Sequence, residues 1–236
     1  MSTTSHPTFS VIDDNELFIV INKSPGISFH SESGDPGLFE QVKSALSLDE
    51  LYPVHRLDKI TSGLLLFAKT KQSASDLSAL FRLRQVSKYY LAISDKKPKK
   101  KQGLIKGDVE ASRRGSWKLC KSRENPAITQ FFSHSIKPGM RLYLLKPHTG
   151  KTHQIRVSLK SLSAPIVGDM LYHNAWEASK ADRGYLHAYG LSFSLHDKSY
   201  AFIDPPSIGT LFLEESTQKV IQEQYASPDT LPWPAL

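Results

Sequence analysis

The sequence is short of cysteine and of long apolar runs. Its 236 residues include one cysteine, Cys120, so a disulfide framework and a zinc site built on cysteine pairs are both excluded. The longest apolar stretch, GLLLFA at 63–68, is far below the ~20 residues that a bilayer span requires. The N-terminal residues lack the basic and apolar segments of a leader peptide. We therefore expect a protein of the reducing cytoplasm that does not enter a membrane.

The signatures of nucleotide, hydride and metal chemistry are also missing. No GxGxxG, GxSxG or HExxH motif occurs. The TGKT stretch at 149–152 is not a phosphate-binding loop of the GxxxxGK type, because position 145 is Leu. His148 and His153 have no carboxylate close to them in the sequence that could complete a metal site. We expect neither a metal nor a cofactor.

The chain does contain an excess of positive charge. Thirty Lys and Arg residues against 23 Asp and Glu residues give a net charge of +7, and the isoelectric point is near 9.3. A basic protein of this kind most often binds nucleic acid. The one charge run, KKPKKK at 96–101, has two interpretations, a solvated loop tip or a finger that contacts phosphates.

Strand patterns outnumber helix patterns along the chain. The apolar runs of strand length lie at 17–22, 63–70, 88–94, 128–136, 141–147, 185–195 and 198–204. Short turns separate the last two pairs of runs, which predicts hairpins. Helical periodicity predicts helices that start near 35–36, over 74–84, over 153–162 with Thr152 as N-cap, and around 217–225. The pattern predicts an α+β fold with a mixed, mainly antiparallel central sheet and flanking helices.

Two polar segments could carry chemistry. His55, Arg56 and Asp58 share an aperiodic loop before an apolar strand. This loop holds either an Arg–Asp ion pair that pins it or an ionised carboxylate that serves as nucleophile or base. The segment from His148 to Arg156 is rich in donors for phosphate or carboxylate and leads into a predicted helix. It is either an anion contact or a polar helix cap.

These segments carry a family resemblance. HRLDKITSGLLLFAK at 55–69 closely resembles the active-site motif of the RluA family of RNA pseudouridine synthases, HRLD followed by TSG and an apolar run that ends in Ala-Lys. Further blocks resemble the family in order and spacing: INKSPGISFH at 21–30, SKYYLAI at 87–93, TGKTHQIRVS at 149–158, PIVGDMLY at 165–172 and YLHAYGLSF at 185–193. The resemblance spans about residues 15–213. Ser24 and Ser158 stand where many relatives have Pro and His.

The resemblance implies that the chain isomerises uridine to pseudouridine in tRNA or rRNA, after flipping the base out of its stack. Asp58 matches the catalytic Asp, which acts as nucleophile or as base. Arg156 matches the Arg that pairs with this Asp, and Tyr90 matches the Tyr that stacks on the target base. Arg56 matches the Arg that fills the space of the departed base. The other RNA-binding residues implied are His55, Thr61, Lys151, His153 and Gln154.

The resemblance also suggests a domain layout. We expect an N-terminal tail at 1–14, a catalytic domain at 15–215, and a C-terminal helix and tail at 216–236. About 15 residues precede the first block, so we expect a compact member without the N-terminal RNA-binding module, and a monomer with no obligate protein partner. The alternative function is a non-catalytic RNA-binding or ribosome-assembly factor that retained the fold.

Overall fold

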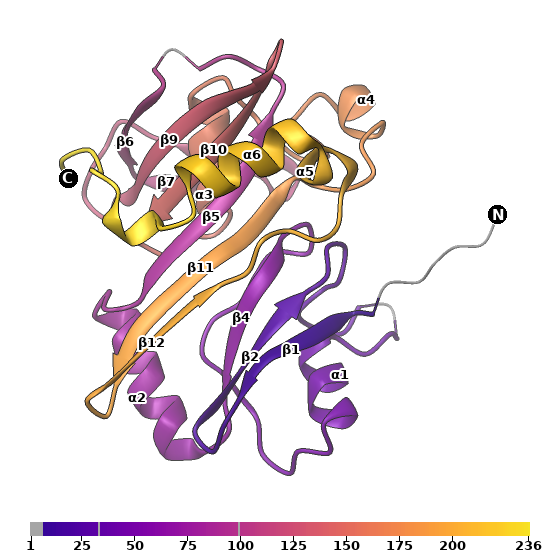
Figure 1. Cartoon of the computed structure of the whole chain (residues 1–236), viewed down its shortest axis with the longest axis vertical. Helices are drawn as coiled ribbons and strands as arrows, with labels where there is room; N and C mark the ends of the chain where they lie inside the picture. Colours follow the sequence, from indigo (N-terminus) through magenta and orange to yellow (C-terminus); the bar gives the residue numbers. More distant parts are fainter. Residues whose placement is uncertain (1–6, 33, 99) are drawn as a thin grey trace.

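Ten strands form one sheet that runs through the molecule (Figure 1). The computed structural model describes residues 7–32, 34–98 and 100–236. The strand order is β1-β2-β4-β11-β5-β10-β9-β6, with β3 paired to β4 and β12 paired to β11. The strands of this sheet are β1 (Phe9–Asp14), β2 (Phe18–Lys23), β3 (Tyr52–Pro53), β4 (Ser62–Ala68), β5 (Ser87–Ser94), β6 (Gln102–Gly107), β9 (Ala127–Lys137), β10 (Met140–Pro147), β11 (Leu186–Leu195) and β12 (Lys198–Ile203).

Within the described ranges β4 and β11 run parallel, and the other pairs of this sheet are antiparallel. The predicted mixed, mainly antiparallel sheet is therefore confirmed. Both predicted hairpins, β9–β10 and β11–β12, are present. A separate small hairpin joins β7 (Val109–Ala111) to β8 (Trp117–Leu119).

Helices flank the sheet in two groups, as the α+β prediction requires (Figure 1). α1 (Leu38–Ala45) and α2 (Lys71–Arg82) pack near β2 and β4, whereas α3 (Gln154–Ser161) and α6 (Glu215–Gln224) pack against β9 or its neighbour β10. The short helical segments are η1 (Arg113–Gly115), α4 (Ala175–Ala178), α5 (Thr210–Leu213) and η2 (Pro228–Thr230). The sheet thus has two halves, and β11 lies between them.

The continuous apolar run of β4 follows from its position. All seven of its residues are buried. Leu64 and Leu66 enter an apolar cluster with α2, while Leu65 and Phe67 enter another with α1. A strand that is covered on both faces has no solvent side, so its sequence does not alternate. β4 therefore provides a rigid support for the preceding loop, which contains Asp58.

The N-terminal boundary of the fold differs from the prediction. Residues 9–14, which the sequence placed in a tail, form β1 at the edge of the sheet. Most of its side chains are exposed, and the pairing with β2 shifts register between Val11 and Asp13. An exposed edge strand with a bulge shows little apolar alternation, so its sequence resembles a tail.

Two helix starts also differ. α1 begins after Gly37 rather than at 35–36, because Asp35 exchanges backbone hydrogen bonds with Glu32 in a tight turn. α3 begins after His153, which has a left-handed φ of 53°, so Thr152 is not the N-cap. The left-handed residue turns the chain sharply at the start of α3.

Candidate active site

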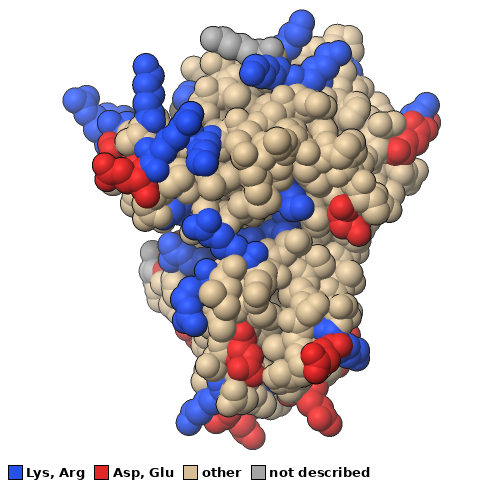
Figure 2. All heavy atoms as spheres, turned by 90° about the vertical axis from the view of Figure 1, so that its left-hand side faces the viewer, with Lys and Arg blue, Asp and Glu red and all other residues tan. Residues whose placement is uncertain are grey.

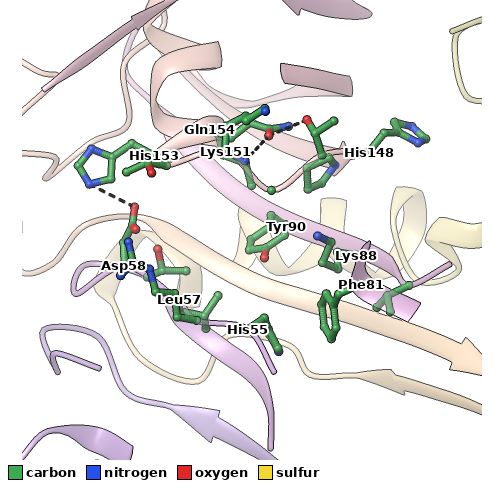
Figure 3. A pocket seen from close by; sticks show the side chains of 18 of the residues that line it. His55, Leu57, Asp58, Phe81, Lys88, Tyr90, His148, Lys151, His153 and Gln154 are labelled. Atoms are coloured by element: carbon green, nitrogen blue, oxygen red, sulfur yellow. Dashed lines mark hydrogen bonds and ion pairs between the residues drawn. The ribbon is translucent and has the colours of Figure 1, made fainter. Parts of the chain in front are cut away.

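A cleft of about 710 Å³ lies between the two halves of the sheet. Its walls come from the loop before β4, the end of α2, the start of β5, and the segment from Lys146 to Arg156. Figure 2 shows Lys and Arg side chains gathered along the hollow that crosses this face. In Figure 3, Asp58 and His153 lie at one end, Lys88 and His148 at the other, and Tyr90 between them. We call these the Asp58 end and the basic end.

Hydrogen bonds and side-chain packing hold the Asp58 loop against β4. The Thr61 amide donates to the Asp58 carbonyl at 3.0 Å, which closes a turn. Leu57 is buried in the core beside it. The Leu66 amide donates to His55 Nε2 at 3.0 Å, and the His55 ring stacks on Phe81. Burial, with a smaller effect of Lys88, lowers the pKa of His55 to about 3, so its ring is neutral and accepts this bond.

Asp58 is paired with Arg156, which lies 98 positions further along the chain. Arg156 Nη1 donates to Asp58 Oδ2 at 3.1 Å. The opposite edge of the guanidinium is held by Asp169, with Nε to Oδ2 at 2.7 Å and Nη2 to Oδ1 at 2.9 Å. This bidentate geometry fixes the plane of the guanidinium and leaves the Nη1 group to donate to Asp58. The predicted pairing of Arg156 with Asp58 is confirmed.

Asp169 lets this arginine stay charged inside the protein. Asp169 is fully buried, and Arg156 is 6% exposed. Burial by itself lowers the pKa of Arg156, but the hydrogen bonds and charges of Asp169 and Asp58 raise it overall. A buried charge without such a partner is strongly unfavourable. Asp169 belongs to the PIVGDMLY block, and sequence reasoning gave it no role.

His153 also faces Asp58. Its Nε2 is 4.0 Å from Asp58 Oδ2, and its Nδ1 bonds the Tyr172 hydroxyl at 2.9 Å. Burial and Arg156 lower the pKa of His153, while Asp58 raises it, and the net direction is down. The Tyr172 hydroxyl accepts from the Trp117 amide at 2.9 Å, so it can donate its own proton to His153. The proton of the neutral ring then lies on Nε2, toward Asp58.

Tyr90 separates the two ends of the cleft (Figure 3). Burial and, to a smaller extent, Asp58 raise the pKa of its phenol, so Tyr90 stays protonated. Side chains alternate along β5, which places Lys88 and Tyr90 on the cleft side and Tyr89 on the other. The cleft therefore has an aromatic ring beside its carboxylate.

The remaining predicted site residues differ in whether their side chains are bonded within the protein or free for a ligand. Gln154 uses its Nε2 for the Ile128 carbonyl and the Thr129 hydroxyl, and its Oε1 accepts from Thr149 and the Lys151 amide. All four of its hydrogen-bonding positions are filled within the protein, so the Gln154 side chain connects the TGKT loop to β9. Its predicted RNA contact would need one of these bonds to break.

Lys151 and Thr61 line the cleft. Lys151 Nζ donates to Asn125 Oδ1 at 2.6 Å. Arg56 also lines the cleft, is exposed, and makes no hydrogen bond or ion pair to any described residue. Its guanidinium is therefore available to a ligand.

A buried lysine supports the Asp58 loop from behind. Lys23 is fully buried, and its Nζ donates to the carbonyls of Ser24 at 2.8 Å and Lys59 at 3.3 Å. Burial and then Arg183 lower the pKa of Lys23 to about 7, against the opposing effect of Asp58. The sequence placed Lys23 in the first family block, but only the fold shows that it reaches the residue after Asp58.

The described ranges hold neither a cluster of metal-ligating side chains nor an apolar helix of membrane-spanning length. No group of three or more His, Cys, Asp or Glu side chains is arranged there to hold a metal ion. None of the helices in those ranges has both the length and the apolar character that a bilayer span requires.

Known proteins are similar to this chain over most of its length. Residues 17–161 match the family model described as RNA pseudouridylate synthase. An uncharacterized RNA pseudouridine synthase of Haemophilus influenzae is 47% identical over 218 residues, which cover 92% of this chain and 96% of that protein. The dual-specificity RNA pseudouridine synthase RluA of Pasteurella multocida is 30% identical over 85% of this chain and 94% of that protein.

A solved structure agrees with these matches. Human RNA Pseudouridylate Synthase Domain Containing 1 superposes with a TM-score of 0.73 at 25% identity, over 87% of this chain and 86% of that one. The sequence matches favour an enzyme over a non-catalytic RNA-binding factor. The chain belongs to the RluA-type RNA pseudouridine synthases, a family of RNA-modifying isomerases.

Proposed function

We propose that the chain isomerises a uridine of tRNA or rRNA that is flipped out of its helix into the cleft, where Asp58 acts on the ribose. The observation that carries this proposal is the Asp58 carboxylate. Among the described lining residues it is the one acidic group, and basic side chains surround it. The glycosidic bond of a paired uridine is out of reach within the stack, so the nucleotide must leave it.

The geometry supports an oriented Asp58 with one carboxylate oxygen that bonds no described residue. Its Oδ2 accepts from Arg156, while its Oδ1 has no hydrogen bond to any residue in the described ranges. Oδ1 is therefore the atom available to a ribose, either to form a bond with it or to remove a proton from it. Tyr90 lies where a base flipped toward Asp58 would meet an aromatic ring.

The bond changes need no external oxidant or hydrolytic water. The bond from ribose C1′ to uracil N1 breaks, and a bond from C1′ to uracil C5 forms. C5 loses its proton, and N1 gains one. The hydrogen bond to Asp58 suggests the role of Arg156, and the family resemblance suggests that of Arg56. Arg156 orients Asp58, and Arg56 takes the place of the base in the stack.

The test is Asp58→Asn. The change is nearly isosteric, so the variant should keep its melting temperature and its RNA affinity but lose isomerisation. Turnover would be measured on a uridine-containing stem-loop in monovalent salt with EDTA. Turnover within tenfold of the wild-type protein would contradict the role of Asp58. A chemical pseudouridine map of total RNA, from cells with and without the protein, would identify the tRNA or rRNA position.

A further inference from the structure

We propose that the C-terminal segment, residues 226–236, positions the basic end of the cleft for contact with the RNA backbone beside the target uridine. This inference rests on the proposed function. The family model ends at residue 161, so this segment lies outside it. In Figure 1 the segment leaves α6 and runs to the side of the molecule on which the hollow of Figure 2 opens.

Trp233 is the anchor of this segment. Its ring stacks on Tyr89, with centroids 5.9 Å apart, and packs against Phe132 at 4.8 Å. Its Nε1 donates to the Pro228 carbonyl at 2.8 Å, which closes the segment on itself. Trp233 is thus fixed on the reverse side of the strand that carries Tyr90.

Lys146 connects Trp233 to the cleft. Lys146 lines the cleft, and its Nζ lies 5.5 Å from the Tyr89 ring centre and 5.6 Å from that of Trp233. Two aromatic faces hold the ammonium by cation–π attraction without neutralising it. No carboxylate of a described residue forms an ion pair with Lys146, although the charge of Asp229 in the same segment acts on it from beyond ion-pair distance. The charge of Lys146 therefore remains available for a phosphate.

A second connection reaches His148. Gln130 Nε2 donates to the Pro234 carbonyl, and Gln130 Oε1 bonds His148 Nε2 at 2.6 Å. Because the amide nitrogen of Gln130 is committed to the segment, its oxygen faces His148 and accepts the Nε2 proton. The segment therefore sets the ring orientation of a second cleft residue. His148 lies at the basic end, away from Asp58 (Figure 3), and Lys146 lines the same cleft.

The matched variants are Trp233→Leu and Trp233→Phe. Both keep apolar bulk against Tyr89, but only Phe keeps an aromatic face for Lys146. We expect Trp233→Leu to raise KM for a uridine-containing RNA stem-loop by about three- to tenfold, with little change in kcat. The slope of log affinity against log salt should fall by about 0.7 to 0.9, the value of one phosphate contact. Trp233→Phe should restore both quantities. Trp176→Ala, at an exposed tryptophan on α4, is the control.

Binding would be measured in the Asp58→Asn background, so that turnover does not interfere. The inference is overturned if Leu and Phe at position 233 give the same KM and the same salt slope, or if the loss lies in kcat. If the wild-type protein converts uridine but the two variants do not differ, the inference alone fails. If the wild-type protein converts no uridine in any RNA, the proposed function fails, whatever the salt slopes show.

Discussion

The two ends of the cleft hold their side chains in opposite ways. At the Asp58 end, directed hydrogen bonds fix each group: Asp169 holds Arg156, Arg156 holds Asp58, and Tyr172 holds His153. At the basic end, the lysines lie over aromatic rings, Lys88 over Phe81 and Lys146 over Tyr89 and Trp233, while Arg82 and Arg84 are exposed.

The difference corresponds to two tasks. A reacting carboxylate must be placed within about 0.5 Å of its productive position, which requires directional bonds from rigid elements. Phosphates of an RNA backbone need positive charge more than fixed geometry, because their affinity comes mainly from counterion release. We expect substitutions at the Asp58 end to affect kcat, and also stability where they break the buried Arg156–Asp169 pair, and those at the basic end to affect KM and salt dependence.

Asp169→Asn should produce the largest loss of stability. The amide would direct a donor at the guanidinium of Arg156, which leaves a buried charge without its partner. Breaking a buried pair in this way costs about 3–5 kcal/mol of the free energy of unfolding. The measurement is urea denaturation together with kcat. Glu177→Gln, in the exposed pair with Lys180, is the matched control and should cost about 0.5 kcal/mol or less. Equal losses in the two variants would show that Asp169 is not needed to hold the site.

Arg56→Ala should impair activity on folded RNA more than on unstructured RNA. If Arg56 fills the space that the flipped base leaves, it matters only where a stack exists. The loss of kcat/KM on a folded stem-loop should exceed that on an unstructured oligomer by about tenfold or more, because unstacking costs a few kcal/mol. Parallel assays on the two RNAs would decide this. Equal losses would indicate that Arg56 instead supports the Asp58 loop.

Lys23→Met tests the support behind Asp58 through pH. The folded-state pKa of about 7 lies below the ordinary value of 10.5, so the unfolded chain binds more protons between these values. The free energy of unfolding of the wild-type protein therefore gains a contribution that rises from about pH 7 to pH 10. The variant should lose that part of the slope, as followed by denaturation at several pH values. Lys59→Met, at an exposed lysine, should keep it.

Substitutions in the KKPKKK run should have the smallest effect on RNA binding. Lys100 and Lys101 are exposed and do not line the cleft, and Lys99 lies outside the described residues. If the run contacts phosphates, replacing Lys99, Lys100 and Lys101 by Ala should lower the salt slope of RNA binding by about 0.7 to 0.9 for each lost contact. Filter binding over a salt series would show it. An unchanged slope would assign the run to a solvated loop.

Much of the fold follows from local pattern. The apolar run of β4, the hairpins β9–β10 and β11–β12, and the helix α2 each lie where periodicity places them. The elements that the sequence did not place correctly are those whose hydrophobic or capping pattern is weak. β1 is an exposed edge strand, and α3 starts at a left-handed histidine that no N-cap rule describes. In both cases tertiary contacts decide the local conformation.

The sequence by itself determined which chemistry is present: a loop with His55, Arg56 and Asp58, a second loop that ends in Arg156, and no motif for a metal or nucleotide. Only the tertiary structure decided how these groups are used. It brings Arg156 to Asp58 across 98 residues, assigns Asp169 to hold it, and occupies Gln154 within the protein. It also places Trp233 against Lys146, a residue of the basic end of the cleft. The physical reason is that periodicity reports burial along one element, whereas hydrogen-bond partners depend on how distant elements pack together.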